Sequence, residues 1–276
     1  MHILTREGKL NQDTRRKLKQ VYHLYQFIEP LLDEVHRHRP DPVLVDHGAG
    51  KSYLGFILYD LYYQVARAAQ GLQGRIIGVE TRAELVAKSR ELAQRLGFER
   101  MDFLNLSVAQ SQGAAQMPVQ VDIVTALHAC DTATDDALAF GLKHQARHMV
   151  LVPCCQAEVA GVLRQSKALS IKRTPLAELW RHPLHTREFG SQITNVLRCL
   201  QLQAHGYSVT VTELVGWEHS LKNELILASR HQPVRPSQAR EAAQRLRDLL
   251  QELGLSDLGG RFSVPVDREE PIAPRL

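Results

Sequence analysis

The feature that most constrains the fold is the sequence of residues 43–55, VLVDHGAGKSYLG. A run of apolar, mostly β-branched residues ends in Asp46, and the small residues Gly48, Ala49 and Gly50 follow closely. The pattern predicts a buried strand, a tight turn and the start of a helix. Such a unit binds nucleotide-like ligands, because glycines let the backbone approach closely and a helix N-terminus presents N–H groups.

Two common nucleotide-binding motifs do not fit this turn. A Walker A loop needs a glycine where this chain has Val45, so the GKS at 50–52 is interpreted as a coincidence. A dinucleotide fingerprint needs a third glycine where this chain has Tyr53. The remaining DxGxG pattern at 46–50 resembles motif I of class I S-adenosylmethionine (SAM) methyltransferases. The alternative is an ordinary glycine turn between a strand and a helix.

The residues after the turn predict a second strand that also ends in an acid. Residues 74–80, GRIIGVE, end in Glu80 about 30 residues after the turn, as a βαβ unit requires. Apolar spacing predicts a helix of roughly 52–70 between the two strands and another over 82–96. An acid at the end of the second strand can accept hydrogen bonds from ribose hydroxyls.

Further strands and a terminal hairpin complete the expected sheet. Short apolar runs predict strands at 101–106, 121–127 and 148–152, and alternating segments at 207–214 and 224–229 predict a hairpin. Strands that alternate with helices predict an α/β fold. We expect a Rossmann-like, seven-stranded, mostly parallel sheet with a terminal antiparallel hairpin, as in class I methyltransferases.

Polar residues and cysteines cluster where the fourth and fifth strands end. The fourth strand is followed by LHACD at 127–131, and the fifth by PCCQ at 153–156. Ligands of open α/β sheets bind beyond the carboxyl ends of strands, so both clusters are expected where the methyl group is delivered. They contain His128, Cys130, Asp131, Cys154, Cys155 and Gln156.

The two clusters carry a more specific family resemblance. LHACDTATD at 127–135 together with PCCQ at 153–156 resembles one branch of class I methyltransferases. That branch includes eukaryotic tRNA 2′-O-ribose methyltransferases and several methyltransferase-like proteins. The resemblance covers about residues 10–230 and includes SLKNE at 220–224. This chain departs from it at Asp131, where the family usually has glycine, and at Gln156, where the tRNA enzymes have histidine.

The resemblance implies SAM as the cofactor and gives roles to residues of this chain. Asp46 and the glycine turn would hold the methionine part of SAM, Glu80 its ribose, and Ser107 would lie beside its adenine. The cofactor-binding candidates are Asp46, Gly48, Ala49, Gly50, Glu80, Ser107, Leu127 and His128. The catalytic candidates, which would accept or relay a proton, are His128, Asp131 and Lys222, with Glu224 beside them. The substrate-binding candidates are Cys130, Cys154, Cys155 and Gln156.

The cysteines allow three interpretations. A thiolate could attack C6 of cytosine, as in RNA cytosine-C5 methylation, although those enzymes have Pro-Cys where this chain has His-Ala-Cys. His128 and the cysteines could bind zinc, but no Cys-x-x-Cys is present and adjacent cysteines rarely chelate one ion. The third interpretation is structural, with small buried residues shaping the pocket. We predict no metal, and we expect Cys199, within a helical pattern, in the core.

Composition limits the partners and the compartment. The net charge of +4 and the pI near 8.9 are a mild bias toward anionic partners. The basic cluster TRRKLK at 14–19 begins a helix, so we expect it either to contact RNA phosphates or to form a solvated face. No apolar run reaches the ~20 residues of a membrane helix, and MHILTREGKL lacks the apolar region of a signal peptide. We expect a cytoplasmic protein.

We expect three parts: an N-terminal helical segment over 1–40, a methyltransferase domain over 41–232, and a C-terminal helix and tail over 233–276. The predicted function is transfer of a methyl group from SAM to an N or O acceptor in RNA, such as tRNA or rRNA. The alternatives are a protein or small-molecule methyltransferase, and a SAM-binding accessory protein without catalysis. The fold itself does not choose among them, because it hosts many chemistries.

Overall fold

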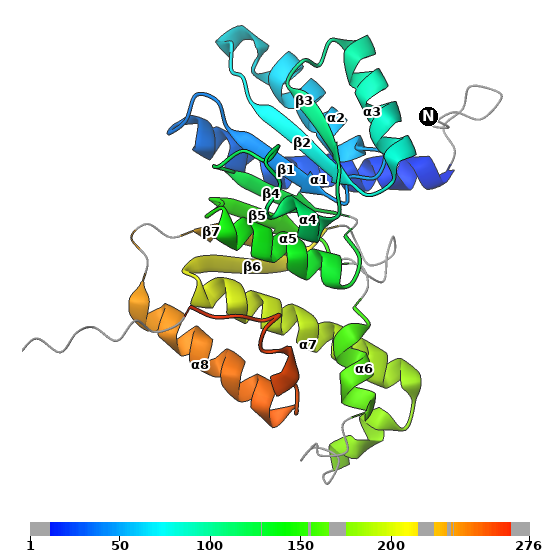
Figure 1. Cartoon of the computed structure of the whole chain (residues 1–276), viewed down its shortest axis with the longest axis vertical. Coiled ribbons are helices and arrows are strands. Elements are labelled where there is room, and N and C mark those ends of the chain that lie inside the picture. Colours follow the sequence, from blue (N-terminus) through cyan, green and yellow to red (C-terminus); the bar gives the residue numbers. More distant parts are fainter. Residues whose placement is uncertain are drawn as a thin grey trace, which may run out of the picture. The chain divides into compact units, whose positions relative to one another are not determined.

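The chain divides into two compact units. Its computed structural model describes residues 12–127, 129–153, 156–165, 175–214, 224–230, 233 and 235–265. Unit one comprises Met1–Glu158 and Val209–Arg230, and unit two comprises Val159–Ser208 and His231–Leu276. Figure 1 shows the helices and strands of each. The expected divisions at residues 40 and 232 stay a prediction.

Unit one is built on a seven-stranded sheet. Its strands are β1 (Val43–His47), β2 (Arg75–Glu80), β3 (Met101–Asn105), β4 (Ile123–Ala126), β5 (His148–Leu151), β6 (Tyr207–Glu213, whose first two residues belong to unit two) and β7 (Glu224–Arg230). Their order in the sheet is β3-β2-β1-β4-β5-β7-β6. The pairs from β3 to β5 are parallel, and β7 runs antiparallel to β5. The expected fold class is confirmed.

The sheet order explains why a ligand site forms beside β1. Every residue of β1, β4 and β5 is buried, as expected for strands covered on both faces. From β1 the chain continues outward through β2 and β3, then returns to the other side of β1 as β4. This reversal is a topological switch point, where a crevice opens beyond the carboxyl ends of the strands. The ends of β1 and β4 therefore determine the place of the site.

Helix α1 (Gln12–His36) precedes the sheet and packs on the core of unit one. Val21, Leu24, Ile28 and Leu32 are all at most 3% exposed, so these residues form a buried apolar face of the helix. The helix contains the predicted basic cluster at 14–19, whose side chains lie outside the described residues. Contact of that cluster with RNA therefore stays a prediction.

The segment after the glycine turn differs from the single α-helix expected over 52–70. It consists of α2 (Tyr53–Leu58), a π-helix (Tyr59–Ala66) and a 3₁₀ turn (Ala68–Gln70). In the π-helical part, the Tyr62 hydroxyl donates to Asp33 Oδ1 at 2.7 Å. Arg67, just beyond it, pairs with Asp33 Oδ2 at 2.6 Å. These contacts with α1 are tertiary, so apolar periodicity along the segment could not predict the wider helical turn.

The remaining helices of unit one connect its strands. They are α3 (Ala83–Leu96), α4 (Val108–Ser111) and α5 (Thr132–Lys143). Helix α3 begins one residue after the predicted start and ends at Gly97, whose φ of 68° is the left-handed conformation that a helix C-cap favours.

Unit two is helical in its described parts. It contains α6 (Glu158–Gln165, whose first residue belongs to unit one), α7 (Pro183–Ala204), α8 (Pro236–Glu252), and 3₁₀ segments at Pro175–Trp180 and Ser256–Leu258. Its core includes Leu163, Leu197, Leu246 and Phe262, all at most 1% exposed. Helix α8 lies within the range 233–276, where a C-terminal helix was expected. Cys199, expected in the core, is half-buried on α7. Among the described residues of the whole chain, no helix meets the length and hydropathy needed to span a membrane.

Candidate cofactor-binding site

The turn after β1 has a backbone that glycine favours. Gly48 and Gly50 have φ values of 67° and 59°, both in the left-handed region. Ala49 N donates to Val79 O on β2 at 3.0 Å, and Ser52 N donates to Ala49 O at 2.7 Å. The turn is therefore closed on itself and fastened to the neighbouring strand.

A glycine on β2 lets the turn pack closely against the sheet. A Cβ added at Gly78 would lie 2.9 Å from Phe103 Cδ1, 3.0 Å from Ser52 Oγ and 3.3 Å from Ala49 Cβ. The first two distances leave no room for a larger side chain. Gly78 thus sets how near the turn lies to β2.

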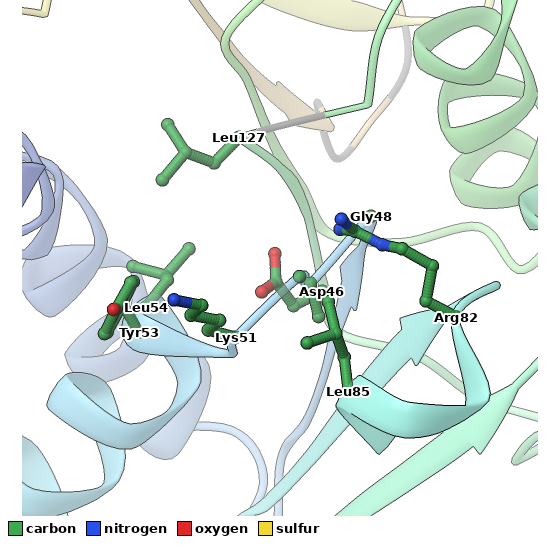
Figure 2. A pocket seen from close by; sticks show the side chains of 10 residues that line it. Asp46, Gly48, Lys51, Tyr53, Leu54, Arg82, Leu85 and Leu127 are labelled. Atoms are coloured by element: carbon green, nitrogen blue, oxygen red, sulfur yellow. The ribbon is translucent and has the colours of Figure 1, made fainter. Parts of the chain in front are cut away.

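A cavity of about 290 Å³ opens above the turn (Figure 2). Its size is close to the lower end of ordinary small-molecule sites. Five predicted cofactor-binding residues line it: Asp46, Gly48, Ala49, Gly50 and Leu127. The carboxyl ends of β1 and β4 thus meet at one cavity, as their adjacency in the sheet requires.

Asp46 brings a buried carboxyl group to this cavity. The residue is 3% exposed, and the hydroxyl of Thr125 on β4 donates to Asp46 Oδ1 at 2.7 Å. Burial raises the pKa of Asp46 to about 7, against a partial lowering by the Thr125 hydrogen bond. A cationic ligand group beside Asp46 would favour the ionised carboxylate.

Glu80 supports the same turn from the end of β2. Its Oε2 accepts from Gly50 N at 2.8 Å, and its Oε1 accepts from Arg82 N at 3.0 Å and Arg82 Nε at 2.9 Å. Burial alone would raise the pKa of Glu80, but the hydrogen bonds from Arg82 and Gly50 outweigh it and hold the pKa at about 2. Glu80 is therefore ionised at neutral pH, and it joins β2 to the glycine turn.

Several other predicted residues have different surroundings or lie outside the described part. Ser107 caps α4, where its Oγ accepts from Gln110 N at 3.1 Å, and it is not among the residues that line the cavity. Its place beside adenine stays a prediction. Outside the described residues are His128, Cys154, Cys155 and Lys222. The cytosine-C5 and zinc interpretations depend on some of these residues, so both stay open.

Sequence reasoning missed five residues of the cavity: Lys51, Tyr53, Leu54, Arg82 and Leu85. Lys51 belongs to the GKS tripeptide that was set aside as a coincidence, and Arg82 follows Glu80 by two residues. In the view of Figure 2, the Asp46 side chain lies between those of Lys51 and Arg82. Proximity to the glycine turn and to the acid of strand two was the signal that could have found both cations.

A second turn follows β4 and contains Asp131. Ala133 N donates to Cys130 O at 3.1 Å, and Asp131 has φ 51° and ψ −123°. These values are those of the first central residue of a type II′ turn, a position that glycine favours. The conformation explains the glycine that the resembling family has here, and for aspartate it costs about 1–3 kcal/mol.

The Asp131 side chain reaches the loop that follows β5. Its Oδ1 accepts from Ala157 N at 2.9 Å and from Glu158 N at 3.4 Å, at the start of α6. Gln156 next to this contact is 4% exposed, whereas Cys130 is solvent-exposed. Glu224 is the first residue of β7 and is half-buried. The predicted clusters after β4 and β5 are therefore joined, through Asp131.

The residues at the first turn fit SAM, the cofactor implied by the resemblance. Among the described residues, the neutral hydroxyl of Thr125 is the hydrogen-bond donor that Asp46 has, so a buried carboxyl group is available for the amino group of the methionine part. The left-handed glycines bring backbone close to the cavity. Glu80 is not among the residues that line the cavity, but its carboxylate holds Gly50 and Arg82, which are. Its contact with sugar hydroxyl groups stays a prediction.

Comparisons with known proteins agree with this fit. A family described as "Methyltransferase domain" matches residues 16–162, more than half of the chain. A Bos taurus protein described as "Glutathione S-transferase C-terminal domain-containing protein" is 23% identical over 250 residues. The match covers 82% of this chain but 35% of that protein, so the chain spans about a third of its curated relative.

Solved structures also resemble the chain at low identity. Magnesium protoporphyrin IX methyltransferase from Synechocystis PCC 6803 is 13% identical with a TM-score of 0.46, covering 81% of this chain and 89% of that one. An rRNA methylase from Streptococcus thermophilus is 10% identical with a TM-score of 0.42, covering 74% and 94%. At these scores the likenesses carry no argument about substrate.

Proposed function

Because the chain belongs to the methyltransferase domain family, we propose that it transfers a methyl group from SAM to an N or O acceptor in RNA. SAM is the cofactor that the family implies, and when bound it supplies an electrophilic methyl group on its sulfonium. The residues of this chain would bind SAM and orient it. Asp46 would face the cationic amino group of SAM, the turn at 48–50 would present its backbone, and Glu80 would accept hydrogen bonds from the ribose hydroxyls.

The observation that carries the RNA proposal is a cationic groove beside the cofactor cavity. It encloses about 290 Å³ and shares Lys51 and Leu85 with that cavity. Its other lining residues come from α3: Lys88, Ser89, Glu91, Leu92 and Arg95. Lys88 and Arg95 lie two helical turns apart, so both point to one face of α3.

The charge of this groove suits phosphate groups. Its lining includes three cations, Lys51, Lys88 and Arg95, and one carboxylate, Glu91. Within the described part of the chain, no acidic side chain forms an ion pair with any of the three cations. Unpaired cations in a row bind a phosphate backbone without reading its sequence. The basic cluster at 14–19 is proposed as a further contact.

The first experiment asks which class of molecule is methylated. The purified chain is incubated with SAM labelled in its methyl group, together with total cellular RNA or with total protein and small metabolites. We expect label in RNA, and no label with the Asp46→Ala variant. Label in protein or metabolites alone would support the alternative substrates, and label in none of them would support the accessory SAM-binding alternative.

A second experiment tests the groove itself. The double variant Lys88→Glu/Arg95→Glu should weaken RNA binding at least tenfold and flatten its salt dependence, because fewer phosphate contacts release fewer counterions. Glu91→Lys in the same groove is the matched variant and should strengthen RNA binding. SAM affinity should be unchanged in both. Equal RNA affinity in all three proteins would exclude the groove as the RNA contact.

A further inference from the structure

One side chain joins the loop that follows β4 to the loop that follows β5. Asp131 lies in the turn after β4, and its Oδ1 accepts hydrogen bonds from the backbone of Ala157 and Glu158, beyond β5. β4 and β5 are adjacent parallel strands, so the loops start side by side. A bond between main-chain donors and this carboxylate fixes the second loop relative to the first.

The turn that presents Asp131 is itself held in place. Ala133 N donates to Cys130 O, and Thr134 N donates to Asp131 O at 3.2 Å. The buried hydroxyl of Thr134 donates to Ala129 O, on the residue just before the turn. The backbone at Asp131 has a φ of 51°, which glycine would adopt without strain. A strained residue persists where its surroundings determine it, and such residues cluster at functional sites.

We infer that Asp131 is a positioning residue, which ties the loop after β5 to the loop after β4 and so sets the shape of the acceptor side. This inference rests on the proposed methyl transfer. It differs from the sequence-based hypothesis that Asp131 accepts a proton from the acceptor. A proton acceptor must direct a lone pair at the substrate. Oδ1 of Asp131 is directed at two backbone N–H groups, so this oxygen holds the loop, and the substitutions below test whether the carboxylate also accepts a proton.

Three substitutions separate the two roles. Asp131→Asn keeps an oxygen that accepts both N–H groups, suits the positive φ of a type II′ turn, and cannot act as a carboxylate base. Asp131→Gly relieves the backbone strain but removes the acceptor. Asp131→Ala removes the acceptor and keeps the strain. Comparison of the glycine and alanine variants therefore isolates the backbone from the side chain.

The first measurement is independent of any acceptor. Amide hydrogen exchange at Ala157 and Glu158 is followed in the full chain, together with SAM affinity. Asp131→Gly and Asp131→Ala should accelerate exchange at both amides at least tenfold, and Asp131→Asn should stay within about threefold of the wild type. SAM affinity should change less than threefold throughout. Unchanged exchange in the glycine and alanine variants would overturn the inference.

The second measurement uses the methyl acceptor. Asp131→Asn should keep most of kcat and the pH profile of the wild type, whereas Asp131→Gly should raise KM for the acceptor and lower kcat. An Asp131→Asn variant as inactive as Asp131→Gly, with the acid limb of its pH profile gone, would make Asp131 the base and overturn the positioning role. A wild type that methylates no acceptor refutes the proposed function alone, because the exchange data still decide whether Asp131 ties the loops.

Discussion

Two turns of unit one each contain a non-glycine residue with a positive φ, and the side chains of these two residues make different contacts. Ser52, in the turn after β1, has a φ of 55°, and Asp131, in the turn after β4, has a φ of 51°. The Ser52 hydroxyl is buried and, among the described residues, has no hydrogen-bond partner. The Asp131 carboxylate accepts from two backbone N–H groups of another loop. Backbone strain alone therefore does not identify a functional residue. The contacts that the side chain makes must also be known.

The turns also differ in what they offer a ligand. The first turn combines a backbone cradle with the buried Asp46 and is fastened to β2 through Ala49 and Glu80. The second turn holds the loop that follows β5 through the Asp131 carboxylate. The comparison predicts that damage to the first turn changes cofactor binding and damage to the second changes acceptor turnover.

The largest expected effect is loss of SAM binding in Asp46→Ala. Removing one partner of a buried charge pair costs about 2–5 kcal/mol, so the dissociation constant should rise by roughly 30-fold or more. Isothermal titration calorimetry at pH 7 measures it. Asp248→Ala, on the exposed face of α8, is the control and should bind as the wild type does. If Asp46→Ala binds SAM with unchanged affinity, the assignment of the first turn to the cofactor is wrong.

Gly78→Ala should push the first turn away from β2. Its added Cβ would lie 2.9 Å from Phe103 Cδ1 and 3.0 Å from Ser52 Oγ, and such overpacking costs about 1–3 kcal/mol. We expect a loss near 2 kcal/mol in chemical denaturation, together with weaker SAM binding. Ser52→Gly in the same chain should restore more stability than it adds by itself, because it removes one of the two obstructing atoms.

Gly161→Ala is the matched control for this pair. An added Cβ there meets no atom within 4 Å, so the substitution should not destabilise α6. Equal costs at Gly78 and Gly161 would mean that the turn does not depend on close approach to β2.

The pH dependence of SAM affinity should follow Asp46. The pKa of its carboxyl is raised to about 7, so in the ligand-free protein a proton competes with a cationic ligand below that pH. Affinity should fall about tenfold per unit from pH 7 to pH 5.5, since one proton must be released on binding. Glu80, with a pKa held at about 2, stays ionised over this range. Asp46→Asn should bind weakly with no such slope, and a wild-type affinity that is flat in pH would contradict the prediction.

The same carboxyl affects the stability of the ligand-free protein. Folded Asp46 keeps its proton up to about pH 7, whereas the unfolded side chain loses it near the ordinary aspartate pKa of 3.8. The folded state therefore binds more protons between these values, and the contribution of Asp46 to the free energy of unfolding falls as pH rises from about 4 to about 7. The free energy of unfolding of Asp46→Asn should lack this decrease between about pH 4 and about pH 7.

The smallest expected effect is a gain of about 1 kcal/mol in Ser52→Gly. The left-handed backbone costs an L-residue about 1–2 kcal/mol, and a buried hydroxyl without a partner adds to it. The greater freedom of glycine in the unfolded chain offsets about 0.4–1 kcal/mol. Gln145→Gly, at an exposed residue with a φ of 51° whose side chain accepts from Arg230, should gain less. If Ser52→Gly lowers the stability instead, the Ser52 hydroxyl makes a contact that stabilises the fold.

Much of the fold could be predicted because it depends on local patterns. The buried runs ending in Asp46 and Glu80 predicted β1 and β2 within one residue, since a strand buried on both faces needs continuous apolar sequence. The helix over 82–96 followed from apolar periodicity, and it ends at Gly97, whose conformation suits a C-cap. The π-helix at Tyr59–Ala66 was missed, because its tyrosines are placed by contacts with α1.

The candidate site was predictable in its backbone and less so in its side chains. Asp46 and the glycines were found from their spacing, and they line the cavity. Lys51 belongs to the GKS tripeptide, which does not complete a Walker A motif, and Arg82 belongs to no motif. Ser107 was chosen for its loop, but its side chain caps α4. Which side chains enter a cavity depends on the packing of neighbouring elements, so the residue order around a turn is insufficient.

The amino-acid order alone determined that strands alternate with helices, that the chain turns tightly after Asp46, and that Glu80 ends the next strand. These are local properties, because burial and backbone conformation are encoded residue by residue. Tertiary structure alone decided that Arg82 and Gly50 share the Glu80 carboxylate, that Lys51 joins Lys88 and Arg95 in one groove, and that Asp131 reaches Ala157. These contacts join residues from different elements, and only the distances in the folded chain determine them.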